Sequence, residues 1–180
     1  MPTKNKVWYG QVALRANEAR TGPLLVEVYT DRKRLRLNGE VTEENVRKLL
    51  EEAEAKELPI DLSYMNLSNL KGTKLFVGRN LRFANLRGIT STQLDFSGGS
   101  LFGAILIKAI ATKSAFAKTD FSSADAWNAD FQYAITFEDA TGLDTVQHLG
   151  TARFHGAKGL SDASKAIILK ANPNMKFGYV

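Results

Sequence analysis

The sequence has no cysteine and only two histidines, His148 and His155, among its 180 residues. Disulfide scaffolds, thiolate metal sites, cysteine nucleophiles and histidine-rich metal sites are therefore excluded. No apolar run approaches the roughly 18 residues of a membrane span, and the N-terminus lacks the apolar segment of a secretory signal. We expect a cytoplasmic protein with no cofactor, no metal ion and no membrane partner.

The positive charge is not concentrated in any one segment. The net charge is +5, with 11 basic and 10 acidic residues in 1–60, 10 and 8 in 61–160, and 3 and 1 in 161–180. A nucleic-acid-binding protein usually gathers its basic residues on one face or stripe. The charge distribution therefore gives little support for an anionic partner.

Residues 1–60 have the pattern of a small α/β unit. Apolar and alternating segments at 24–29 and 34–37 predict strands, and Asn38-Gly39 predicts a turn. Thr42 is a candidate N-cap for a helix that ends before Pro59. The apolar stripe of this helix consists of Val46, Leu49, Leu50 and Ala53.

Residues 61–160 repeat with a period of five. From Ala84 onward most pentapeptides begin with a small residue, and seven of ten central residues are large and apolar. These central residues are Leu86, Ser91, Phe96, Leu101, Leu106, Ala111, Phe116, Phe121, Ala126 and Phe131. A period of five fits neither a helix nor a flat strand. It indicates a solenoid whose short extended segments turn a corner every five residues.

The pentapeptides AlaAsnLeuArgGly, ThrAspPheSerSer and AlaAspPheGlnTyr resemble the repeat of the pentapeptide-repeat family. The resemblance covers residues 62–160, with an unclear register between Leu67 and Leu81. It implies a mainly β fold: a right-handed quadrilateral β-helix of about five coils. A coil whose four sides are one pentapeptide each places Phe76, Phe96 and Phe116 in one inward column, which is compatible with a core.

Some members of this family protect DNA gyrase from quinolones by resembling duplex DNA, which requires length and an acidic surface. Five coils at about 4.8 Å each give a stack of about 24 Å, the length of about seven base pairs. The net charge of residues 61–160 is +2. Length and charge therefore both argue against DNA mimicry by a single chain.

No group of residues in the sequence has the pattern of a catalytic site. Asp120, Asp125 and Asp130 are five residues apart, so we expect them at outward polar positions on successive faces. Lys108, Lys113 and Lys118 are expected at successive corners for the same reason. His148 lies near Asp144, Thr145 and Thr151, but the sequence contains no glycine-flanked nucleophile. We predict that the protein is not an enzyme.

Two sets of residues are candidates for binding. A basic cluster has the spacing to contact phosphates, or to form the solvated face of a strand; it consists of Arg32, Lys33, Arg34 and Arg36. Apolar residues at outward repeat positions predict either a partner-binding surface or a surface covered within the chain. These are Ile105, Ile107, Ile110, Trp127 and Tyr133.

Residues 161–180 predict a capping helix with Ser161 at its start, followed by an apolar tail. In proteins with this repeat the C-terminal end commonly forms dimers. We therefore predict a homodimer with contacts from Met175, Phe177 and Tyr179.

The leading interpretation is a protein-interaction scaffold in three parts, at 1–60, 61–160 and 161–180, with a protein partner that the sequence does not identify. The alternatives are a topoisomerase inhibitor that partly mimics DNA and a nucleic-acid-binding protein that uses the basic cluster.

Overall fold

The computed structural model describes residues 34–37 and 39–178. The chain divides into two units, 1–33 and 34–180, and the second unit holds all of these residues. The predicted strand at 24–29 lies outside the described residues.

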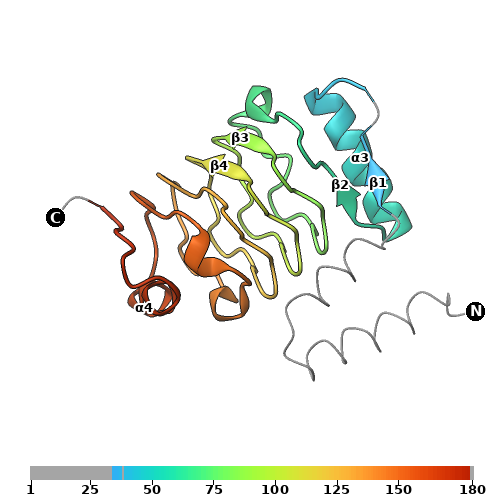
Figure 1. The fold of residues 1–180 in the computed structure, drawn as a ribbon. Helices are drawn as coiled ribbons and strands as arrows, with labels where there is room; N and C mark the ends of the chain where they lie inside the picture. Colours follow the sequence, from blue (N-terminus) through green and yellow to red (C-terminus); the bar gives the residue numbers. More distant parts are fainter. Residues whose placement is uncertain (1–33, 38, 179–180) are drawn as a thin grey trace, which may run out of the picture. The chain divides into compact units, whose positions relative to one another are not determined.

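Most of the second unit is a stack of coils whose neighbours are joined by parallel β-bridges (Figure 1). Over much of the stack the bridged residues are four pentapeptides apart, as in the ladders Asn80–Ser100–Asp120 and Asn85–Ile105–Asp125. Only β3 (Thr90–Thr92) and β4 (Ile110–Thr112) pair as three-residue strands within the coils. This regular spacing agrees with the four-sided coil predicted from the repeat.

Two local interactions explain why the chain turns every five residues. The polar residue in the second position of the repeat accepts a hydrogen bond from the N–H two residues later, an Asx turn. Eight aspartate or asparagine side chains of the coils do this at 2.9–3.2 Å: Asp61, Asn66, Asn80, Asn85, Asp95, Asp120, Asp125 and Asp130. The fifth position adopts the left-handed conformation, with φ of 56°, 56° and 54° at Lys108, Lys113 and Lys118. These lysines therefore lie at corners, as predicted.

The inward side chains form columns along the stack. The rings of Phe76, Phe96, Phe116 and Phe137 follow one another at centroid distances of 5.2, 5.4 and 5.0 Å, and each contact is stacked. Stacked aromatic pairs of this kind contribute about 0.5–1.5 kcal/mol beyond their buried area. All central residues of the predicted pentapeptides are buried, so the predicted inward columns are confirmed.

Insertions change the coil length near both ends of the stack. The bridged residues Asn66 and Thr90 are four positions further apart in the sequence than the regular spacing. The additional residues lie in the stretch that contains the 3-10 helix η1 (Ser68–Leu70), where the sequence left the register of the repeat unclear. Later bridges exceed the regular spacing by one position at Ala115–Thr136, by two at Asp125–Gln147 and by three at Asp130–Arg153. Two further 3-10 helices, η2 (Leu143–Thr145) and η3 (Leu149–Thr151), lie in these longer coils.

The helix α3 (Glu43–Lys56) and two short strands close the start of the stack. Thr42 caps the helix by accepting a hydrogen bond from the N–H of Asn45. The predicted stripe of Val46, Leu49, Leu50 and Ala53 is buried in the same core cluster as the coil interior. The strand β1 (Leu35–Arg36) pairs in parallel with β2 (Ile60–Asp61), which in turn bridges to Asn85. The core is continuous across residue 60, and the predicted division there stays a prediction.

The helix α4 (Asp162–Ala171) closes the other end, where the sequence predicts a capping helix. Ser161 accepts a hydrogen bond from the N–H of Ser164, and α4 packs against η2 and η3. The side chain of Asn172 donates to the carbonyl of Gly150 at 3.0 Å, which holds the end of the helix on the last coil. Among the described helices, none is long and apolar enough to cross a membrane.

Candidate interaction surface

Three of the five predicted partner-binding residues are exposed at the coil surface, and two are not. Ile110, Trp127 and Tyr133 have exposed fractions of 42%, 39% and 50%. Ile105 and Ile107 are buried, with 3% and 6%, so for these two residues the alternative of cover within the chain holds and the exposed partner-binding surface does not. They lie outside the core cluster that fills the coil. The repeat indicates the direction of a side chain but not how far other side chains cover it.

Trp127 lies in one column with Arg87 and Ile107. The residue that follows each of these lies at a corner, and the corner column consists of Tyr64, Gly88, Lys108 and Asn128. The ladder bonds from the N–H of Lys108 to the carbonyl of Trp127, and from Gly88 to Ile107, define these columns. The ammonium group of Lys108 lies 5.2 Å from the centroid of the Trp127 ring, a cation–π contact. An exposed aromatic ring and a cation therefore share one position on the coil surface.

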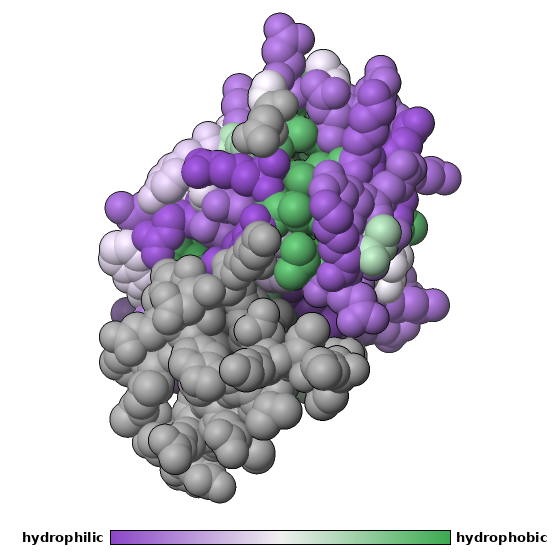
Figure 2. All heavy atoms as spheres, turned by 90° about the vertical axis from the view of Figure 1, so that its right-hand side faces the viewer, coloured by the Kyte–Doolittle hydropathy of each residue, from purple (hydrophilic) through white to green (hydrophobic). Residues whose placement is uncertain are grey.

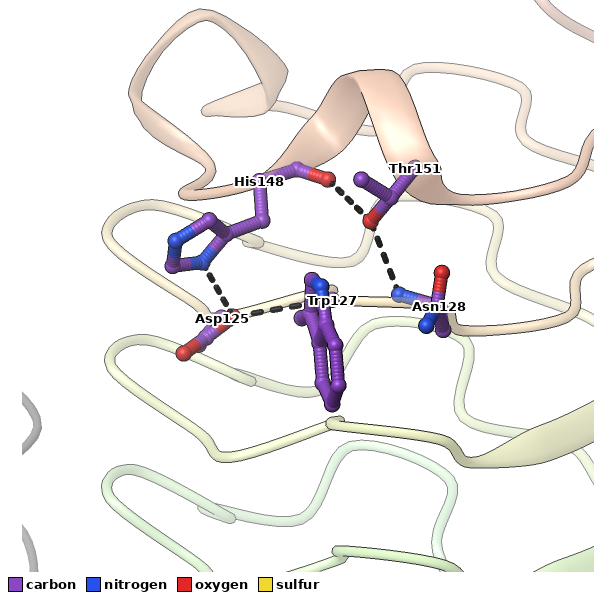
Figure 3. Close-up of polar contacts among 5 residues, drawn as sticks. All are labelled: Asp125, Trp127, Asn128, His148 and Thr151. Carbon is purple, nitrogen blue, oxygen red and sulfur yellow. Dashed lines mark hydrogen bonds and ion pairs between the residues drawn. The ribbon is translucent and has the colours of Figure 1, made fainter.

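A buried carboxylate fixes the backbone beside Trp127 (Figure 3). Asp125 Oδ1 accepts a hydrogen bond from the Trp127 N–H at 3.1 Å and lies 2.9 Å from Nδ1 of His148. The Asp125 side chain is 2% exposed, whereas that of His148 is 49% exposed. The imidazole of His148 thus covers the carboxylate from the next coil.

A second contact joins the same two coils. The Thr151 hydroxyl accepts a hydrogen bond from the N–H of Asn128 at 2.8 Å and donates to the carbonyl of His148 at 2.8 Å. Figure 3 shows these bonds on one side of Trp127 and the Asp125–His148 pair on the other. Together they hold the Trp127 segment against η3.

Two of the aspartates predicted at outward polar positions are covered by side chains of the next coil. Asp125 and Asp130 are buried, at 1% and 6%, because each caps a backbone N–H and is covered by a side chain from the next coil. The cover of Asp130 is Arg153, whose Nη2 lies 2.7 Å from Oδ2. The sequence signal for the Asp125–His148 and Asp130–Arg153 pairs is the number of residues between neighbouring coils. This number can be recognised only when the inserted residues are added to the regular four pentapeptides.

The pKa of Asp120 lies below its ordinary value. Partial burial raises the pKa, but hydrogen bonds from the Ser122 hydroxyl and N–H and from the Ser100 hydroxyl lower it further than burial raises it. The nearby guanidinium of Arg82 adds to the lowering. This guanidinium also lies 4.1 Å from the centroid of the Phe102 ring.

Tyr133 projects from a corner of the coil, and Ile135, whose exposure the repeat did not indicate, follows it closely in the chain. Its ring meets His155 edge to face at a centroid distance of 5.6 Å, and a Cβ at Gly156 would come within 2.5 Å of it. Ile135 follows as an inserted residue between Ala134 and Thr136 and is 55% exposed. The sequence signal for this insertion is the spacing of six residues, instead of five, between the inward residues Phe131 and Phe137.

The predicted basic cluster is only half within the described residues. Arg32 and Lys33 lie outside them. Arg34 donates through Nε to the carbonyl of Phe83 at 3.3 Å, and Arg36 is exposed on β1. Phosphate binding by this cluster stays a prediction.

Two of the three predicted dimer contacts of the tail, Met175 and Phe177, lie against the chain itself. Met175 and Phe177 are partly buried on the core, and the Phe177 carbonyl accepts a hydrogen bond from the Gly156 N–H at 2.7 Å. Tyr179 lies outside the described residues. The homodimer through these residues stays a prediction.

Comparison with known proteins finds a likeness among solved structures. No family model matches the sequence, and no curated protein matches it. Among solved structures, a pentapeptide repeat protein from the thylakoid lumen of Arabidopsis thaliana matches with 22% identity and a TM-score of 0.45, over 62% of this chain and 75% of that one. In their five-residue repeat, residues 62–160 resemble pentapeptide-repeat proteins.

Proposed function

We propose that this chain is a non-enzymatic interaction protein, in which a right-handed quadrilateral β-helix presents a fixed surface to another protein. The observation that carries the proposal is the exposure of Ile110, Trp127 and Tyr133 on neighbouring coils. Tryptophan and tyrosine are enriched at the centres of protein interfaces, and Trp127 and Tyr133 are both exposed here.

The rigidity of the coil favours this role. The backbone on both sides of Trp127 is held by Asp125 and by the Asn128–Thr151 bond. A residue whose backbone is already ordered loses less conformational entropy on binding, which increases affinity for a given contact area. Trp127 is therefore the anchor around which we expect a partner to bind.

The test is capture of partners from host lysate by the intact protein and by two variants. Trp127→Ser/Tyr133→Ser removes both exposed rings of the surface, whereas Tyr64→Ser removes an exposed ring near the start of the stack. We expect the captured partner to be lost with the first variant and retained with the second, as measured by quantitative mass spectrometry. Equal capture by both variants would overturn the proposed surface.

The same experiment separates the alternative roles. Residues 58–148 carry eight acidic and eight basic side chains, so the coils have no net negative charge to imitate DNA. Recovery of gyrase subunits would nevertheless favour the topoisomerase inhibitor. Capture that is abolished by nuclease treatment would favour nucleic-acid binding through Arg34 and Arg36.

A further inference from the structure

One side of the coils carries a net positive charge, although residues 87–156 together have a net charge of −2. We call it the β3–β4 side, and its four segments are residues 87–93, 107–113, 127–133 and 151–156. These segments contain four basic side chains and one acidic side chain, a net charge of +3. The residues between them contain one basic and six acidic side chains, a net charge of −5. The two signs of charge are therefore separated around the coil.

Backbone pairing places the four segments on one side of the stack. The strands β3 and β4 pair in parallel, and the ladder continues through the bridges Ile110–Asp130 and Asp130–Arg153. At the corner that follows these strands, the N–H of Lys113 bonds to the carbonyl of Gln132 in the next coil. Figure 1 shows β3 and β4 next to each other in successive coils. The four segments therefore form successive rungs of the same surface.

The charges that reach the solvent on the β3–β4 side are positive. Lys108 and Lys113 are exposed at corners and form no ion pair within the described residues. The single carboxylate of the four segments belongs to Asp130, whose side chain is 9% exposed and is paired with Arg153, whose side chain is 60% exposed. Residues 1–33 have a net charge of +3, so they bring no net negative charge that could neutralise this side.

The exposed residues of the proposed interaction surface, Ile110, Trp127 and Tyr133, all belong to the β3–β4 side. Lys108 contacts the ring of Trp127, and Lys113 occupies the corner one coil before Tyr133. The end of the stack that carries α3 differs, because there hydrophilic side chains border a narrow hydrophobic strip (Figure 2). The β3–β4 side combines exposed rings with cations, so a partner has to match both.

We propose that the β3–β4 side binds an acidic protein segment that also carries a large apolar side chain. This inference rests on the proposed function and specifies the chemistry of the partner. Carboxylates of the segment face Lys108, Lys113 and Arg153, while its apolar side chain packs on Trp127 and Tyr133. Opposite charges across an interface accelerate the encounter and disfavour partners of like charge.

Ile110 favours a protein segment over a single-stranded nucleic acid. Nucleic acids bind to surfaces of this kind by stacking bases on aromatic rings and by contacts between phosphates and cations. The aliphatic side chain of Ile110, 42% exposed, provides neither contact, but it gains free energy when apolar protein surface covers it. Binding of a single-stranded nucleic acid is therefore the competing outcome of the test.

The first experiment determines the chemistry of the partner without assuming its sequence. Short random peptides displayed on phage are selected on the immobilised full chain, and each recovered peptide is then tested on the Trp127→Ser/Tyr133→Ser variant. We expect the peptides that need the two rings to contain Asp and Glu about three times as often as Lys and Arg, and to contain a large apolar residue.

Two unfavourable results of the selection have different meanings. Peptides that need the rings but carry no excess of acidic residues would overturn the acidic partner and leave the proposed interaction surface in place. Recovery of no peptide that depends on Trp127 and Tyr133 would overturn both.

A matched pair of lysines tests the charge directly. Lys113 and Lys118 are exposed corner residues with φ of 56° and 54°, and neither forms an ion pair within the described residues. Lys113 belongs to the β3–β4 side, whereas Lys118 lies at the next corner. A selected peptide is synthesised with a fluorescent label, and its binding is measured by anisotropy at about 150 mM salt, where the screening length is about 8 Å. We expect Lys113→Glu to weaken binding about fivefold and Lys118→Glu to weaken it less than about twofold.

Equal effects of Lys113→Glu and Lys118→Glu would contradict binding of the acidic segment at the β3–β4 side. Circular dichroism verifies that both variants are folded, and Lys113→Gln replaces Lys113→Glu if it is not. A labelled single-stranded oligothymidylate is the competing probe, and we expect it to bind more weakly than the selected peptides. Tighter binding of this oligonucleotide than of every selected peptide, lost with Lys113→Glu, would overturn the proposal in favour of nucleic acid.

Discussion

The carboxylates in the second position of the repeat have the same local role but different surroundings. Asp95 and Asp125 each accept a hydrogen bond from the N–H two residues later, at 2.9 and 3.1 Å. Asp125 alone of the two is buried and covered by a histidine. The energetic importance of an aspartate in this fold therefore depends on what the next coil places over it.

This difference predicts unequal costs for the same substitution. Asp125→Ala removes a buried carboxylate together with its bonds to the Trp127 N–H and to His148, which costs about 1–3 kcal/mol. Asp95→Ala removes the same bond at a more exposed site, where water replaces the carboxylate, and we expect about 0.5–1 kcal/mol. Urea unfolding midpoints of the two variants provide the measurement. Equal losses would show that the His148 cover contributes nothing.

Asp120 predicts a dependence of stability on acid. Its pKa is lower in the folded state than in the unfolded chain, so it stabilises the fold above about pH 4, the ordinary range of aspartate, and this contribution is lost as the pH falls through the lowered value. Asp120→Asn should lose less stability between pH 5 and pH 2 than the unaltered protein does. Thermal melts across this range, with Asp144→Asn as an exposed control, measure the difference.

At the scale of the elements, the two capping helices and the repeat were predictable because their signals are local. Thr42 and Ser161 are N-caps in the sequence and in the structure, and the apolar stripe of α3 follows from its 3.6-residue period. The burial of Ile105 and the pairing of His148 with Asp125 were not predictable. They depend on contacts between coils, whose alignment shifts with each inserted residue.

The attachment of α4 predicts a destabilising substitution at the last coil. A Cβ at Gly150 would lie 2.4 Å from the carbonyl oxygen of Ala171, at the end of α4. Gly150→Ala should therefore displace the helix and cost about 1–3 kcal/mol. Gly178→Ala is the matched control, since nothing lies within 4 Å of a Cβ built there. Urea unfolding compares the two, and an unchanged midpoint for Gly150→Ala would mean that α4 does not depend on this close approach.

At the scale of the whole molecule, each coil contacts only the coils before and after it. Residues in the middle, such as Ile105, have bridge partners on both sides, Asn85 and Asp125. In stacks of this kind stability is a sum of contacts between neighbours, and opening begins where a neighbour is missing.

We therefore expect amide hydrogen exchange to be slowest in residues 104–112 and progressively faster toward both ends. Native-state exchange followed by NMR or mass spectrometry measures the gradient. Uniform protection along the stack would indicate that the coils and caps unfold as one unit instead.

The growing coil length at the C-terminal side has a consequence for how the repeat stops. Bridge partners are four pentapeptides apart in the middle of the stack, and the last turns exceed that spacing by one, then two, then three positions. A further regular turn laid on the longest of these would have too few residues to follow its outline, so its backbone groups would not meet their partners. The increase in coil length therefore ends the repeat, because a further coil of regular length would not match the backbone of the coil before it. The helix α4 covers the last coil instead.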